Sequence, residues 1–81
     1  MKWRHTARSK EDYAGAPIQI QKAFDKQARL LAENRLHPSL HAKKYSESLD
    51  VWQARVNRDW RFYFVVEGDT YVIARIVPHP K

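Results

Sequence analysis

The sequence predicts a small α+β domain over residues 1–81, with an antiparallel sheet and two N-terminal helices packed on one face of that sheet. Three observations lead to this class. Apolar residues recur at helical spacing in the first half of the chain and alternate with polar residues in the second half, and a chain of 81 residues has room for one core only. The expected element order is β-α-α-β-β-β.

The first half of the chain contains the two expected helices. Weak alternation over residues 2–8 predicts a short edge strand, and Ser9 then has the character of a helix N-cap, followed by acids that suit the helix dipole. Gly15 keeps this helix short, and Pro17 is well placed to begin a second helix that runs to about residue 34. The helical spacing places the following residues on one face of the second helix: Ile20, Ala23, Phe24, Gln27, Ala28 and Leu31.

The second half of the chain contains three expected strands. Residues 36–50 are polar and irregular, so we expect a loop there. Segments 51–56, 60–67 and 70–77 are rich in aromatic and β-branched residues and are separated by turn residues, which is the pattern of antiparallel strands. Alternation in the middle strand predicts four core-facing side chains: Trp60, Phe62, Phe64 and Val66.

The length of the last hairpin loop decides where Arg75 points. A two-residue Gly68-Asp69 loop would place Arg75 beside Phe62 and bury a charge among aromatic rings, which costs several kcal/mol. A three-residue loop over residues 67–69 places Arg75 opposite Arg61 on the other face. The charge penalty favours the second arrangement.

The sheet face opposite the helices is predicted to carry charges of one sign. Arg55, Arg61 and Arg75 converge on it, and His79 continues the parity of Arg75. One interpretation is that these arginines are solvated strand positions with weak local salt bridges to nearby carboxylates. A half-buried sheet normally has mixed charges on its polar face, so the uniform charge favours a phosphate-binding site instead.

Composition excludes several other classes of function. Fifteen Lys and Arg against nine Asp and Glu give a net charge of +6, which favours a polyanion or an acidic protein as partner. The absence of cysteine excludes disulfides, thiolate zinc sites and a cysteine nucleophile, and two glycines are too few for a glycine-rich phosphate loop. The longest apolar run is too short to span a bilayer, and the N-terminal residues are polar, so we expect a cytoplasmic protein without membrane contact.

Several segments together resemble one family of toxins. The run from Val51 to Phe64, with its Arg-Val-Asn and Trp-Arg pairs, resembles the second and third strands of RelE/ParE-superfamily toxins, with HigB-like and related RelE-like members the most similar. The segments 37–40, Lys43-Lys44 and 76–79 fit the same pattern in the same order. The resemblance implies a type II toxin–antitoxin toxin, neutralised by a cognate antitoxin, that enters the ribosomal A site and cuts mRNA.

The resemblance also implies a site. RNA cleavage without a metal or another cofactor needs a base for the 2′-hydroxyl, a cation for the phosphorane and an acid for the leaving oxygen. Arg61 matches the family arginine after the aromatic residue of the third strand, and His79 matches its C-terminal histidine, a side chain suited to proton transfer at neutral pH. Lys44 is the third expected catalytic residue, whereas His37 and His41 are interpreted as loop surface residues. The expected contacts to RNA phosphate or base come from Arg55, Arg75, Lys43, Arg58 and Tyr63.

Two other functions stay open at this point. ParE-like members of the superfamily inhibit DNA gyrase and are not nucleases, and an inactive basic RNA-binding member would also fit the sequence. Pro80 and Lys81 follow His79 where many active relatives carry a tyrosine, so either His79 suffices for proton transfer or the activity is weak or altered.

Overall fold

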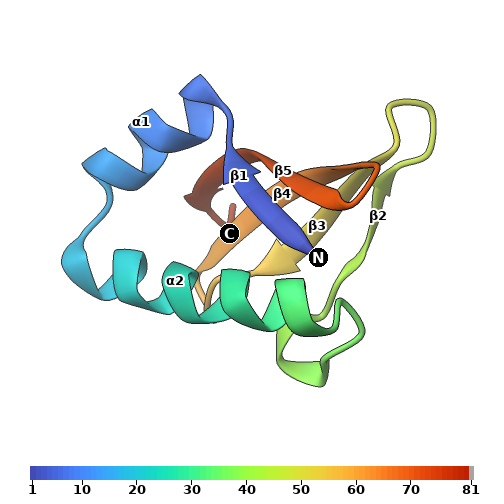
Figure 1. Ribbon diagram of the computed structural model, residues 1–81. Coiled ribbons are helices and arrows are strands. Elements are labelled where there is room, and N and C mark those ends of the chain that lie inside the picture. Colours follow the sequence, from blue (N-terminus) through green and yellow to red (C-terminus); the bar gives the residue numbers. More distant parts are fainter. Residues whose placement is uncertain (81) are drawn as a thin grey trace.

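A five-stranded sheet crossed on one face by a long helix forms the body of the protein (Figure 1). The computed structural model describes residues 1–80. Its helices are α1 (Ala7–Gly15), α2 (Ile18–Glu33) and the short 3₁₀ helix η1 (Pro38–Leu40), and its strands are β1 (Lys2–His5), β2 (Lys43–Ser46), β3 (Val51–Arg55), β4 (Trp60–Glu67) and β5 (Thr70–Pro78). The predicted α+β class is confirmed, with β2 as an additional strand. Neither α1 nor α2 is long and apolar enough to cross a membrane.

The core lies between α2 and the near face of the sheet. The apolar face predicted for the second helix is the face that is buried, and Phe24 meets Phe62 of β4 edge to face with ring centroids 5.3 Å apart. Leu40 anchors η1 to this core and is fully buried, whereas Leu36 is exposed. The strand alternation predicted from Phe62 and Phe64 is therefore confirmed.

Helix α1 begins earlier than the sequence predicts. The N-cap is Thr6, whose hydroxyl accepts a hydrogen bond from the backbone N–H of Ser9, while the hydroxyl of Ser9 accepts one from the backbone N–H of Thr6, each over 3.1 Å. Ser9 thus occupies the third helical position of a capping box, and its side chain is fully buried. The prediction that Ser9 is the N-cap was wrong. Threonine and serine are both good N-cap residues, so the sequence alone did not distinguish Thr6 from Ser9.

The sheet is mixed, and its strand order is β1-β5-β4-β3-β2. The first strand lies parallel to the last, and the remaining pairs are antiparallel. Strand β2 falls in the segment expected to be a loop. It pairs with β3 at the sheet edge, where one side of a strand faces solvent, so its residues did not show the apolar alternation of an inner strand.

The β4–β5 hairpin places Arg75 on the expected face of the sheet, but its geometry differs from the prediction. Its turn is the two-residue Gly68-Asp69 loop, with Glu67 opposite Thr70, and Gly68 adopts a positive φ of 60°. A β-bulge then shifts the register, so that Phe64 pairs with Ile73 but Tyr63 pairs with Arg75. The predicted three-residue loop, and the pairing of Arg75 with Arg61, were therefore wrong. The bulge supplies the extra residue that keeps the Arg75 charge out of the aromatic core.

Arg75 is bound by α1. The carboxylate of Asp12 accepts hydrogen bonds from Arg75 Nε over 2.7 Å, Arg75 Nη2 over 3.3 Å and the backbone N–H of Ile76 over 3.0 Å. Helix α1 thereby covers the stretch of β5 beyond the end of β1. Burial alone would raise the pKa of Asp12, but the hydrogen bonds from Arg75 and Ile76, together with the Arg75 charge, outweigh it and hold that pKa below its usual value.

Asp12→Ala is expected to destabilise the fold by about 1.5–3 kcal/mol, because it removes three hydrogen bonds to a charged acceptor and leaves Arg75 unpaired. Since the folded-state pKa of Asp12 is lowered, its contribution is complete above the unfolded pKa of about 3.9 and disappears as the pH falls through the folded-state pKa. Urea unfolding at pH 7 and pH 3 measures both effects. Glu11→Ala, an exposed change on the same helix, is the control and should be near neutral.

Candidate functional site

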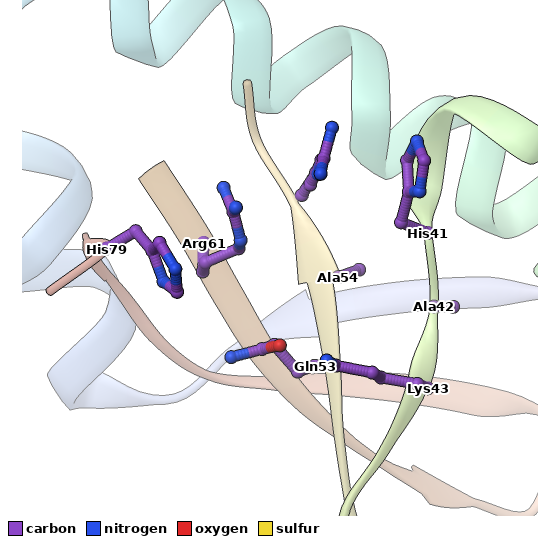
Figure 2. Close-up of a pocket in the computed structure, with 8 residues that line it drawn as sticks. His41, Ala42, Lys43, Gln53, Ala54, Arg61 and His79 are labelled. Carbon is purple, nitrogen blue, oxygen red and sulfur yellow. The ribbon is translucent and has the colours of Figure 1, made fainter. Parts of the chain in front are cut away.

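A pocket of about 480 Å³ opens on the sheet face turned away from α2, which we call the open face (Figure 2). Side chains of β2, β3 and β4, and the residue that follows β5, meet there. Within residues 1–80, the part of the chain that the structure describes, no carboxylate is among the residues that line it, which are His41, Ala42, Lys43, Gln53, Ala54, Arg55, Arg61 and His79. We call this the basic pocket.

Two arginines face each other across the strands at the basic pocket. Arg55 of β3 is paired directly with Arg61 of β4, and within residues 1–80 neither forms an ion pair. The Arg61 side chain is held in place, because its Nη1 donates to backbone carbonyls of the β3–β4 turn and of the first residue of β4. The accepting residues are Asn57, Arg58 and Trp60, at 2.8, 3.1 and 3.0 Å. Like charges at directly opposed positions destabilise a sheet, so this pairing favours an anion between them.

His79 is brought to the same place by the end of β5. Its backbone N–H donates to the carbonyl of Asp59 over 2.7 Å, which ties the chain after β5 to the β3–β4 turn beside Arg61. The imidazole is exposed and lies next to the Arg61 side chain in Figure 2. The structure therefore gathers Arg55, Arg61 and His79 in one pocket, as the sequence predicts, although Arg75 is not among them.

His41 and Lys43 complete the pocket from the edge strand. His41 directly follows η1 in a left-handed conformation with φ 46°, which is uncommon for a residue other than glycine. Lys43 lies opposite Gln53, and its side chain reaches toward Gln53 in Figure 2. Sequence reasoning assigned His41 to the loop surface. The sequence signal for His41 was its two-residue spacing from Lys43, because residues two apart in an extended segment point to the same face. That signal can be used only when residues 43–46 are recognised as a strand.

Lys44 does not reach the basic pocket. Successive strand residues point to opposite faces, so Lys44 lies opposite Trp52 on the helix side, with its ammonium 4.9 Å from the centroid of that ring. It also forms an ion pair with Asp50. The expectation that Lys44 takes part in catalysis is thus at odds with its position, and Lys43 is the lysine that lines the pocket.

The remaining predicted contacts divide by position. Arg58 is exposed in the turn beside the pocket and gives its backbone carbonyl to Arg61. Arg75 lies outside the basic pocket and is neutralised by Asp12. Tyr63 lies on the open face next to the pocket, where its hydroxyl accepts a hydrogen bond from Gln53 Nε2 over 3.0 Å.

The basic pocket has the chemistry of an anion site that can also move protons. Lys43, Arg55 and Arg61 supply positive charge without a compensating acid among the lining residues, and His41 and His79 supply two imidazoles. Arginine suits phosphate because its planar fork donates two parallel hydrogen bonds. Among residues 1–80, no three histidine or carboxylate side chains lie close enough together to hold a metal ion.

Comparison with solved structures identifies the fold. A YoeB/ParE toxin from Agrobacterium tumefaciens matches with a TM-score of 0.81 at 16% identity, covering 99% of this chain and 100% of that chain. The YoeB dimer from Staphylococcus aureus matches at 0.80 and 18% identity, covering 99% and 98%. The RelBE2 toxin–antitoxin complex from Mycobacterium tuberculosis matches at 0.79 and 22% identity, covering 96% of each chain. No family model matches the sequence, and no curated protein sequence matches it significantly.

The chain therefore has the same fold as these YoeB/ParE and RelBE2 structures over nearly its whole length, and the resemblance predicted from the sequence is confirmed at the level of the fold. At 16–22% identity the likeness establishes the fold alone. The function is therefore inferred from the residues of the basic pocket.

Proposed function

We propose that the protein is the toxin of a type II toxin–antitoxin system and that it cleaves mRNA on the ribosome, using its own side chains as acid, base and phosphate ligands. The observation that carries this proposal is the basic pocket. Two directly opposed arginines, a lysine and two histidines share it, and none of its described lining residues carries a carboxylate. The fold shared with YoeB and RelE toxins supports the same class of function.

In this proposal the scissile phosphate lies between Arg55 and Arg61. Its charge relieves the repulsion between the two guanidinium groups, and the additional charge of the phosphorane strengthens both contacts in the transition state. Arg61 is fixed beforehand by the carbonyls of the β3–β4 turn, so it needs little reorganisation when the substrate arrives. Lys43 binds phosphate from the neighbouring edge strand.

The two histidines serve as the acid and base. One imidazole removes the proton of the ribose 2′-hydroxyl while the 2′-oxygen forms its bond to phosphorus. The bond from phosphorus to the 5′-oxygen breaks, and the other imidazole gives its proton to that oxygen. The products are a 2′,3′-cyclic phosphate and a 5′-hydroxyl. We assign the acid to His79, beside Arg61, and the base to His41, on the opposite wall of the pocket (Figure 2).

The proposed partners follow from the same surface. The similar RelBE2 structure from Mycobacterium tuberculosis is a toxin–antitoxin complex, and so is the YoeB–YefM structure from Staphylococcus aureus. We propose an antitoxin partner here whose carboxylates cover Arg55 and Arg61, because acids are missing from the lining of the pocket itself. Ribosome and mRNA are the proposed targets of the free toxin.

Two adjacent lysines provide a matched test of this function. Purified protein is added to ribosomes paused on a defined mRNA, and primer extension maps any cuts. Wild-type protein should cut the mRNA, Lys43→Ala should cut it about 10- to 100-fold more slowly because one charged contact to phosphate is lost, and Lys44→Ala should cut like wild type.

Intact mRNA in the presence of folded wild-type protein would refute the nuclease. Inhibition of DNA gyrase in a parallel supercoiling assay, with mRNA left intact, would support a ParE-like toxin instead. Equal loss of cleavage in both lysine variants would show that the basic pocket is not the site of the reaction.

A further inference from the structure

A second pocket adjoins the basic pocket on the open face. It has a volume of about 310 Å³, and its lining includes Tyr45, Leu49, Tyr63 and Val77. One hydrogen bond links the walls of the two pockets. Gln53, which lines the basic pocket, donates to the hydroxyl of Tyr63, which lines the second pocket. We call the second one the aromatic pocket.

The spacing of the two pockets suits one nucleotide. Arg61 and Tyr63 are two residues apart on β4 and point to the same face, which separates them by about 7 Å along the strand. In the neighbouring strand, Arg55 and Gln53 repeat this spacing. A phosphate held between Arg55 and Arg61 therefore has its adjoining base within reach of the aromatic pocket.

The aromatic pocket differs from the basic pocket in charge. Arg75 is the one cation among its described lining residues, and it is bound by Asp12, so these residues offer no free positive charge to a second phosphate. Two of its apolar side chains are exposed to an unusual degree, Tyr45 at 62% and Leu49 at 73%. Tyr63 supports Tyr45 edge on, with ring centroids 4.9 Å apart, and so orients a ring that is otherwise in solvent.

We propose that the aromatic pocket binds the base next to the scissile phosphate and that Tyr45 is the ring on which this base stacks. The inference rests on the proposed nuclease function and adds a residue that sequence reasoning did not select. Tyr63, the aromatic expected to stack on a base, instead positions Tyr45 and carries the hydrogen bond from Gln53. Because stacking tolerates every base, the aromatic pocket aligns the RNA without a strict sequence preference.

The test pairs a change in the protein with a change in the RNA. Single-turnover cleavage is measured on ribosome-bound mRNA that carries either normal nucleotides or one abasic ribonucleotide on either side of the scissile bond. Wild-type protein should cut one of the abasic substrates about 5- to 100-fold more slowly than normal mRNA. Tyr45→Ala should cut normal mRNA with the same loss and show no further loss on that abasic substrate, whereas Tyr45→Phe should behave like wild type. Leu36→Ala, an exposed change away from both pockets, is the control.

The outcomes separate this inference from the function on which it rests. If wild-type protein cuts neither mRNA, the nuclease proposal fails and the base site fails with it. If wild-type protein cuts normal mRNA and Tyr45→Ala cuts it equally fast, the nuclease stands and the base site is refuted, which leaves the aromatic pocket to a protein partner. If Tyr45→Ala and the abasic change reduce the rate independently, Tyr45 does not stack on that base and the inference is also refuted.

Discussion

Arg61→Ala is expected to slow RNA cleavage by about 10²–10³-fold, the largest loss from any single arginine of the basic pocket. The change removes the side chain of a residue that is only 8% exposed and whose guanidinium is already oriented by backbone carbonyls in and beside the β3–β4 turn. Positive charge is then missing where the phosphorane gains negative charge. Single-turnover cleavage of ribosome-bound mRNA, with protein in excess, measures this rate without interference from product release.

Arg61 also stabilises the fold, so the loss of cleavage in Arg61→Ala has to be distinguished from a loss of stability. Its Nη1 satisfies carbonyls that would otherwise lose a charged donor, so Arg61→Ala should also lower the free energy of unfolding by about 1–3 kcal/mol. Arg55→Ala is the matched control, because Arg55 faces the same space but makes no side-chain hydrogen bond to that turn. It should slow cleavage with little loss of stability. Wild-type cleavage by a folded Arg61→Ala protein would contradict the proposed phosphate site.

His79→Ala is expected to slow cleavage by about 10²–10⁴-fold, because it removes the group assigned to protonate the 5′-oxygen. The loss should depend on the leaving group. An RNA in which sulfur replaces the bridging 5′-oxygen leaves as a thiolate, which needs no proton, so His79→Ala should cut that RNA at close to the wild-type rate.

His41→Ala provides the complementary result. As the assigned base it should slow cleavage of both the oxygen and the sulfur substrate, since the 2′-hydroxyl must lose its proton in either case. His37→Ala removes an imidazole from the same loop and should cut normally, because His37 Nδ1 is occupied by the N–H and hydroxyl of Ser39. Rescue of His41→Ala by the sulfur leaving group, without rescue of His79→Ala, would exchange the two roles.

Local pattern was sufficient for most of the fold. The helical spacing from Ile20 to Leu31 and the alternation from Trp60 to Phe64 each describe an element that buries one face against the other, so the two signals agree with the final packing. The strand β2 was missed for the opposite reason. It lies at the sheet edge with Lys43 and Tyr45 exposed, and a polar edge strand has the composition of a loop.

The hairpin shows how a sound energetic argument can select the wrong geometry. The penalty for burying Arg75 was a valid reason to place it on the open face, and the structure does place it there, opposite Tyr63. A β-bulge accomplishes this in place of a longer turn, and bulges carry no clear signal in a single sequence. The pairing of Arg75 with Asp12 could not be predicted either, because the two residues are 63 positions apart and meet only when α1 packs beside β5.

The alternation of side chains along the strands predicted which strand residues share the candidate site. Arg55 and Arg61 came together because they lie on strands that were correctly identified, and His79 joins them because it directly follows β5. Lys43 and Lys44 could not be told apart while their segment was taken for a loop, because a loop has no fixed alternation. Because β2 was not predicted, Lys44 was selected as the catalytic lysine, although Lys43 is the lysine that lines the basic pocket.

The parallel pairing of β1 with β5 has a consequence for biosynthesis. Strand β1 has its only neighbour in β5, far along the described chain, and the residues of the basic pocket extend from His41 to His79. The sheet and the basic pocket therefore both stay incomplete until the segment that contains β5 and His79 has been made and has joined the rest. The protein can acquire its proposed activity only when these distant segments have met, and the proposed antitoxin could capture it in the interval before they do.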